Sequence, residues 1–98
     1  MNVKIHRAYR EVVAICDSNL LGKKFEEGKF QLDVKESFYK GEELGKHDTI
    51  LLMRNMAKED ATFNLIGEET IQAGIEAGII RKEGIKKIQG VPFALILV

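Results

Sequence analysis

Hydrophobic and polar residues alternate near the start of this chain, which is the pattern of a β-strand with one buried face. Residues 3–6 read Val-Lys-Ile-His, and a run rich in β-branched residues follows at 11–16. Two such strands joined by a short polar turn predict a β-hairpin. Directly after it, Asp17 or Ser18 is expected to cap a short helical turn over 19–25, because their side-chain oxygens accept free amide protons.

Alternation returns at 30–34, where a third strand is predicted. Its apolar side chains would share one buried face; they are Phe30, Leu32 and Val34. The following segment, 35–46, is rich in charge and glycine and has no sustained period. It is interpreted as a surface loop around Phe38 and Tyr39, whose rings are expected to fold back onto the core.

Two helices are predicted from apolar residues that recur at intervals of three and four. The first covers 49–58, with Asp48 as its N-cap. The second begins near 64–67 and stops at Gly78, with two acidic residues in its first turn, where the helix dipole favours them. Gly74 and Gly78 lie on its apolar stripe and would allow close approach of another backbone.

The chain ends with an apolar run at 91–98, preceded by a turn and a short segment at 85–88. A strand that is apolar on both faces is either central in a sheet or covered by a helix or a second subunit. These elements predict an α+β fold: a small mixed or antiparallel sheet with an N-terminal hairpin, two main helices and a buried C-terminal strand. The 98 residues fit one domain, 1–98.

Composition narrows the class of protein without naming an activity. Apolar residues make up 45% of the chain and charged residues 31%, as in an ordered globular domain. Fifteen basic and fifteen acidic residues cancel, so no global field attracts DNA or a membrane, and any basic surface must be local. No apolar stretch is long enough to span a bilayer, and none resembles a signal peptide, so we expect a cytoplasmic protein. The preference for Glu and Lys is a bias of thermophile proteins.

Metal and thiol chemistry have little support in the sequence. Cys16 is the single cysteine, and it ends an aliphatic strand, where a cysteine behaves as a small buried hydrophobe. His6 and His47 are far apart and have no ligand spacing around them. We therefore expect no metal, no cofactor and no thiol catalysis.

The leading site hypothesis is the hairpin tip with Arg7, Tyr9 and Arg10, supplemented by Lys23 and Lys24. Arginine pairs with phosphate and an exposed tyrosine can stack on an unpaired base, so the tip has the residue types that RNA binding uses. This favours a non-enzymatic module that binds RNA or a translation protein, for example on the ribosome.

Two alternatives remain open. A small enzyme could place a pocket at the predicted helix start, with Asn64, Gly67 and Glu68 beside free backbone amides that favour anions. A structural homodimer could close through the C-terminal strand. Neither alternative has a motif of its own in the sequence.

Across nearly its whole length the chain resembles an archaeal family catalogued as domain of unknown function 424. The resemblance lies in Cys16-Asp17, Leu20-Leu21-Gly22-Lys23, Phe25, Glu27-Gly28, Leu32-Asp33-Val34, Phe38-Tyr39, Asn64-Leu65-Ile66-Gly67-Glu68, Ala77-Gly78 and Gly90-Val91-Pro92. It implies a small cytosolic archaeal α+β protein with no assigned activity, often encoded near translation genes. In that family the last proline is often followed by a histidine, whereas this chain has Phe93.

Overall fold

The computed structural model describes residues 1–97, and its centre is a pair of parallel strands that are distant in sequence. β1 (Asn2–His6) and β2 (Val12–Cys16) form the predicted antiparallel hairpin, with Val3 opposite Ile15. β2 then pairs in parallel with β6 (Thr62–Ile66), which the sequence pattern did not predict as a strand. The sheet is therefore mixed, and the expected α+β class is confirmed.

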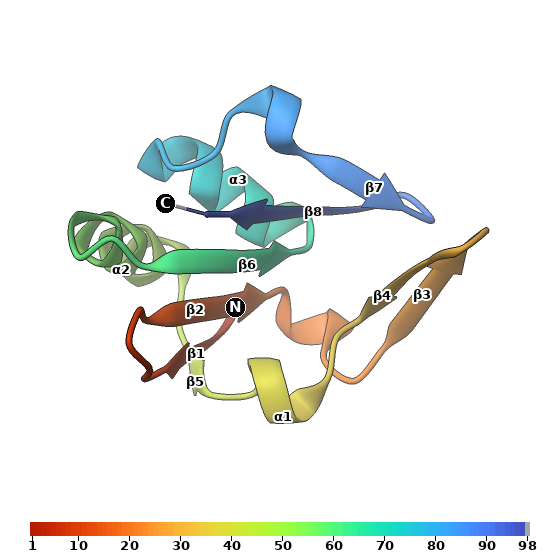
Figure 1. Ribbon diagram of the computed structural model, residues 1–98, viewed down its shortest axis with the longest axis horizontal. Helices are drawn as coiled ribbons and strands as arrows, with labels where there is room; N and C mark the ends of the chain where they lie inside the picture. Colours follow the sequence, from red (N-terminus) through yellow and green to blue (C-terminus); the bar gives the residue numbers. More distant parts are fainter. Residues whose placement is uncertain (98) are drawn as a thin grey trace.

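The remaining strands extend this sheet or form a separate hairpin. The six-stranded sheet has the order β5-β1-β2-β6-β8-β7, and β3 and β4 pair with each other (Figure 1). The bounds are β3 (Lys24–Glu27), β4 (Phe30–Asp33), β5 (Glu42–Glu43), β7 (Lys86–Ile88) and β8 (Val91–Ile96). The helices are α1 (Glu36–Tyr39), α2 (Lys46–Lys58) and α3 (Glu68–Ala77), with short 3-10 turns at Ser18–Leu20 and Lys82–Gly84.

The larger core lies between one face of the sheet and the two long helices, which stand behind the sheet in Figure 1. Alternate residues of the central strands point into it, as the period of two requires. Its buried members include Val13, Ile15, Met53, Phe63, Leu65 and Ile71. Gly74 of α3 is close to the Ile80 side chain, so a Cβ there would collide with it. The close approach at this glycine is made by a side chain, and Gly78 instead ends the helix in the left-handed conformation.

A smaller core occupies the opposite face, beneath α1 and the β3–β4 hairpin. Its buried members are Ala14, Cys16, Leu32, Val34, Tyr39, Ile66 and Ile88. His6 stacks on Phe38, with ring centroids 4.4 Å apart, and this contact holds α1 over β1. The expectation that Phe38 and Tyr39 fold back onto the core is confirmed.

Pro92 occupies the place where the β6–β8 ladder ends. Its carbonyl accepts a hydrogen bond from the Gly67 amide at 2.8 Å, so its proton-free nitrogen faces Gly67 as well. The Gly67 carbonyl accepts instead from Ile71 at 2.9 Å, in the first turn of α3. A proline therefore costs the sheet no ladder bond at this position.

Several local predictions were wrong at the ends of elements. The turn after β2 covers only Ser18–Leu20, and β3 begins at Lys24 within the segment predicted as helical. Helix α2 begins at Lys46, with Gly45 as N-cap, so Asp48 lies in its first turn. The predicted loop contains α1 and β5.

Two further predictions were wrong, one about an element and one about a buried face. Asn64 to Ile66 belong to β6, and α3 begins only at Glu68, because a short apolar segment before a glycine is equally compatible with a strand. Phe30 is 73% exposed at the tip of the β3–β4 hairpin, although Leu32 and Val34 are buried as predicted. A two-stranded hairpin that extends beyond the sheet has nothing against which to bury its tip.

Strand β8 lies inside the sheet between β6 and β7, as its apolar character indicated. One face is buried through Ala94, while Leu95 and Leu97 on the other face are 57% and 72% exposed. Val98 falls outside the described residues. Among residues 1–97, no helix has the length and apolar character needed to cross a membrane.

Candidate functional site

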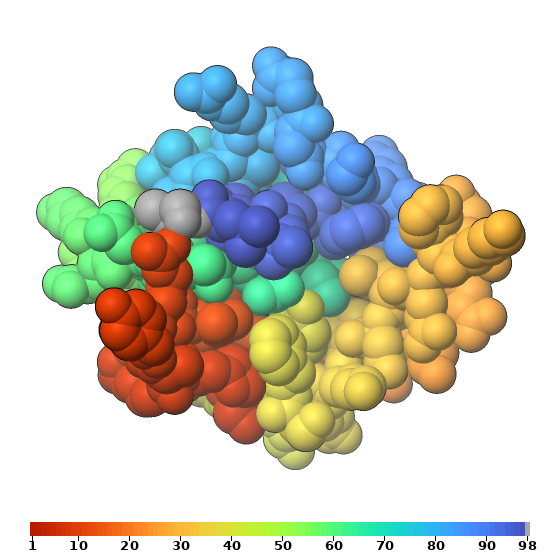
Figure 2. All heavy atoms as spheres, viewed as in Figure 1, coloured from red at the N-terminus to blue at the C-terminus, as the bar shows by residue number. Residues whose placement is uncertain are grey.

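The face of the sheet formed by β6 and β8 is left uncovered where α1 and the β3–β4 hairpin stop. Asn64 of β6 lies opposite Leu95 of β8, and Ile66 lies opposite Phe93, so these side chains share one face. In Figure 2 the dark blue atoms of β8 lie open at the centre of the molecule, with the orange hairpin beside them. Exposed apolar side chains on a sheet face mark a surface that another molecule could cover.

At one end of this face lies a hollow of about 310 Å³, which we call the hairpin groove. It is lined by Glu27, Phe30, Lys86, Lys87, Ile88 and Phe93, from the β3–β4 hairpin and from β7 and β8. Phe30 and both lysines are exposed. The Glu27 carboxylate accepts a hydrogen bond from the Gln89 amide at 2.8 Å, so it is held against the β7–β8 turn. The groove thus combines aromatic surface with cationic side chains, of which Lys86 shares the face of Phe93 and Lys87 points to the opposite face of β7.

A second hollow of about 190 Å³ lies further along β8, and we call it the sheet pocket. Its lining includes Leu32, Tyr39, Asn64, Ile66, Phe93 and Leu95. Phe93 lines both hollows, so the hairpin groove and the sheet pocket adjoin at this ring.

Two polar groups line the apolar sheet pocket. Among residues 1–97, neither the Asn64 side-chain amide nor the Tyr39 hydroxyl makes a hydrogen bond to the protein. Burial, with a smaller contribution from Cys16, raises the pKa of Tyr39 to about 12, so its hydroxyl keeps its proton at neutral pH. A few unpartnered polar groups in an apolar hollow are typical of a ligand site.

Cys16 lies beneath this face and is not positioned for chemistry. Its side chain is fully buried. Burial, and secondly the Asp17 carboxylate, raise the pKa of the Cys16 thiol to about 11. The thiol is therefore protonated at neutral pH and is a poor nucleophile.

The start of α3, proposed above as an anion site, is closed by Asp17. One Asp17 carboxylate oxygen accepts from the Thr70 amide and hydroxyl, both at 2.8 Å, and the other accepts from the Glu69 amide at 3.1 Å. Gly67 has φ of +112°, and a Cβ there would occupy the space of the Asp17 carboxylate. The Glu69 and Thr70 amides, which would attract an anion, are thus already bound to a side chain of this protein.

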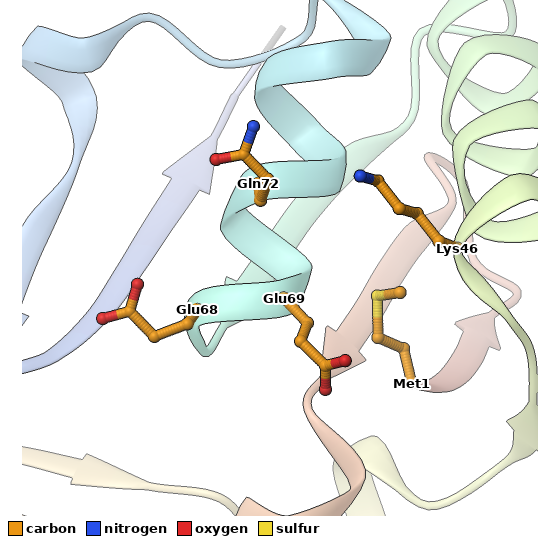
Figure 3. Close-up of a pocket in the computed structure, with 5 residues that line it drawn as sticks. All are labelled: Met1, Lys46, Glu68, Glu69 and Gln72. Carbon is orange, nitrogen blue, oxygen red and sulfur yellow. The ribbon is translucent and has the colours of Figure 1, made fainter.

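The alternative pocket residues Asn64, Gly67 and Glu68 are not brought together. Asn64 lines the sheet pocket on one face, whereas Gly67 packs against Asp17. Glu68 lines a different hollow, of about 290 Å³, on the helix side. Figure 3 shows that hollow, with Lys46 on the opposite side of α3 from Glu68. Lys46 there forms an ion pair of 2.6 Å with Glu76, which lowers the pKa of the Glu76 carboxyl.

The hairpin tip is exposed, as predicted, but it lies far from Lys23 and Lys24, which were expected beside it. Tyr9 is fully exposed, and Arg7 forms an ion pair with Glu11. Arg10 is exposed as well. Lys23 and Lys24 follow the far end of β2, whose five residues span about 16 Å at 3.3 Å per residue. Figure 1 shows the tip and β3 at opposite sides of the molecule.

Sequence reasoning missed the combination of Phe30 with Phe93. Alternation assigned Phe30 to the core, and Phe93 was noted only as a departure from a family pattern. No local signal in the sequence places Lys86 and Lys87 beside either ring. Because these residues are about 60 positions apart, only the packing of two hairpins brings them to one groove. Among the described residues, no three His, Cys, Asp or Glu side chains cluster to hold a metal ion.

Comparison with known proteins agrees with this fold and adds no activity. A family model described as "Protein of unknown function (DUF424)" matches residues 6–98. A crystal structure of an uncharacterized conserved protein from Methanopyrus kandleri is similar to the chain, with a TM-score of 0.86 and 26% sequence identity. The match covers 97% of this chain and 88% of the other. No curated protein matches the chain.

Proposed function

We propose that this chain, which belongs to the DUF424 family, is a non-enzymatic module that binds single-stranded RNA across the uncovered face of β6 and β8. The observation that carries the proposal is the hairpin groove, where Phe30 and Phe93 lie with Lys86 and Lys87. RNA of the translation machinery is the proposed setting.

The proposal combines two interactions: aromatic rings stack on bases, and lysine ammonium groups contact phosphates. An unpaired base can stack on an exposed aromatic ring whatever its identity, and lysines beside the ring can neutralise the backbone phosphates. A protein of zero net charge must concentrate its positive charge locally to attract RNA. Lys86 lies opposite Phe93 in the β7–β8 ladder, so a cation and a ring are adjacent on one face.

The test is titration of a fluorescein-labelled 12-nucleotide RNA, followed by fluorescence anisotropy at several salt concentrations. Phe30→Ala should weaken binding by about 1 to 3 kcal/mol if a base stacks on the ring. Lys86→Gln should reduce the slope of log K against log salt by about 0.7, because each phosphate contact contributes about 0.7 on a single strand. Lys87→Gln should reduce it less, because its side chain points to the opposite face of β7.

Lys58→Gln is the matched control, since Lys58 is an exposed lysine at the end of α2, on the helix side of the sheet. It should leave both affinity and salt slope unchanged. Absence of binding at low salt, or equal affinity for the wild type and Phe30→Ala, would overturn the proposal.

The hairpin tip remains a second proposed contact, because the Tyr9 ring is fully exposed. Replacing both Arg7 and Arg10 with Glu would weaken binding if the RNA extends to this end. Tyr9→Ala would then weaken it by about 1 to 3 kcal/mol. If only the groove variants lose affinity, the tip and its expected partners Lys23 and Lys24 are not contacts.

A homodimer through the C-terminal strand is the competing proposal, and the exposure of Leu95 and Leu97 favours it. Analytical ultracentrifugation separates the two. A dimer that dissociates in the double variant Leu95→Ser, Leu97→Ser, together with absence of RNA binding, would favour the structural role.

A further inference from the structure

We infer that the sheet pocket takes one unpaired adenine base and that Asn64 reads its edge. The inference rests on the proposed function, because the sheet pocket adjoins the hairpin groove at Phe93 and a strand bound in the groove could reach it. It goes further in naming the base and the residue that selects it.

The size of the pocket restricts its occupant. At about 190 Å³ it is smaller than the roughly 300 to 1,000 Å³ of clefts that enclose drug-sized ligands. A volume of about 190 Å³ accommodates a single planar ring system but not a whole nucleotide. Its phosphate and ribose would remain outside, towards Lys86 and Lys87.

The walls provide apolar surface for such a ring. Leu32, Ile66 and Leu95 line the pocket, and the Phe93 ring is shared with the hairpin groove. Leu95 is 57% exposed, so burying it under a base would remove apolar surface from water. A strand that stacks one base in the groove could place a neighbouring base here.

The Asn64 side-chain amide recognises the hydrogen-bonding edge of the base. Asn64 lies between Ala14 and Leu95 in its ladders, so its side chain shares the face of both. Its amide has an acceptor oxygen and a donor nitrogen, and neither is used by residues 1–97. An asparagine amide matches adenine with two hydrogen bonds: the oxygen accepts from the N6 amino group, and the nitrogen donates to N7.

Tyr39 supplies a second donor. Its hydroxyl is unpartnered among the described residues and keeps its proton at neutral pH. A protonated hydroxyl can donate to a ring nitrogen of the base. An uncharged pocket of this kind accepts a neutral ring without loss of a buried ion pair.

The experiment compares three labelled ten-nucleotide RNAs, oligo(A), oligo(U) and oligo(C), with the full chain. The wild type should bind oligo(A) at least about fivefold more tightly than the other two, the lower end of the discrimination from a bidentate amide contact. Asn64→Ala should remove that preference while binding to oligo(U) persists. Asn64→Asp, which can only accept hydrogen bonds, should move the preference towards oligo(C), whose N4 amino group donates.

Asn55→Ala is the matched control, because Asn55 is an exposed asparagine on α2. It should behave as the wild type with all three RNAs. Thermal melts of each variant establish that it is folded. In a second measurement, the Asn64 side-chain amide resonances should shift on addition of oligo(A) and stay in place with oligo(U).

The outcomes separate the two proposals. Equal affinity for the three RNAs, with no effect of Asn64→Ala, would overturn the base assignment and leave RNA binding through the hairpin groove standing. Failure to bind any of the three would overturn the proposed function and this inference with it.

Discussion

Asp17 and Thr70 are 53 positions apart, yet one carboxylate oxygen of Asp17 accepts hydrogen bonds from both the amide and the hydroxyl of Thr70. Asp17 follows β2 and Thr70 lies in the first turn of α3, which follows β6. The parallel pairing of β2 with β6 brings the two ends together. The contact therefore ties the start of α3 to the central strand of the sheet.

Asp17→Ala should lower the free energy of unfolding by about 2 to 3 kcal/mol. It removes a cap and leaves the buried Thr70 hydroxyl without its acceptor, and hydrogen bonds to charged groups contribute about 1.5 to 3 kcal/mol each. Urea unfolding would measure the change. Asp48→Ala is the matched control, since Asp48 is exposed in the first turn of α2, and should cost less than about 1 kcal/mol. Equal losses in the two variants would contradict the role given to Asp17.

Gly67→Ala should be more destabilising than alanine at an ordinary left-handed glycine. Gly67 combines a φ of +112° with a Cβ position that overlaps the Asp17 carboxylate. Gly28 has a φ of +61° and open space, so Gly28→Ala bears only the conformational cost, of about 1 kcal/mol or somewhat more. Comparing the two melting temperatures isolates the overlap. Equal melting temperatures for the two variants would show that the Asp17 carboxylate can move aside without a loss of stability.

Cys16 should resist alkylation in the native protein. Its thiol is buried and its pKa is raised to about 11, so little thiolate exists at pH 8. Iodoacetamide labelling followed by mass spectrometry should be slow in buffer and fast in urea. Rapid labelling of the native protein, at the rate of the unfolded chain, would show that the strand opens or that the thiol is activated.

Alkaline pH should destabilise the protein partly through Tyr39. Burial raises its pKa from 10 to about 12, so between these values the unfolded state has lost a proton that the folded state retains. Stability therefore falls as pH rises through this window, by at most about 1.4 kcal/mol per pH unit for this group. Unfolding midpoints at pH 8 and 11 would measure it. Tyr39→Phe should lose less stability over that interval than the wild type; an identical loss would show that Tyr39 ionises normally in the fold.

The two faces of the strand pair β6 and β8 should respond differently to truncation. Phe63 is 1% exposed, so Phe63→Ala should cost about 3 to 5 kcal/mol. Leu95 is 57% exposed, and Leu95→Ala should cost less than about 1 kcal/mol in a monomer. Unfolding curves at two protein concentrations provide the measurement. A large, concentration-dependent loss in Leu95→Ala would indicate that this face is buried between two copies.

The sequence pattern predicted elements well where the signal is local. Alternation located the first hairpin, periodicity located the bodies of α2 and α3, and Gly78 was recognised as the end of α3. It failed at 64–66, because a segment as short as Asn-Leu-Ile before a glycine is compatible with the end of a strand as well as with the start of a helix. Residues such as Asp48 and Ser18 can cap a helix, but the residue at which each helix begins is set by tertiary contacts.

The location of the candidate site could hardly be predicted from the sequence, because it depends on tertiary structure. The exposure of Tyr9 followed from its place in a hairpin tip, which is a local property. Phe30 looked like a core residue because alternation reports which side chains share a face without saying whether that face is covered. Phe30 and Phe93 line one groove only because two distant hairpins lie side by side.

What the sequence alone determined is the set of elements whose signals act within a few residues: backbone propensity, side-chain period and glycine or proline at turns. Only the tertiary structure decided that Asp17 caps α3, that β6 lies beside β2, and that Asn64 faces an open pocket. These depend on contacts between segments that are tens of residues apart, and such contacts form only when the whole chain buries its apolar surface at once.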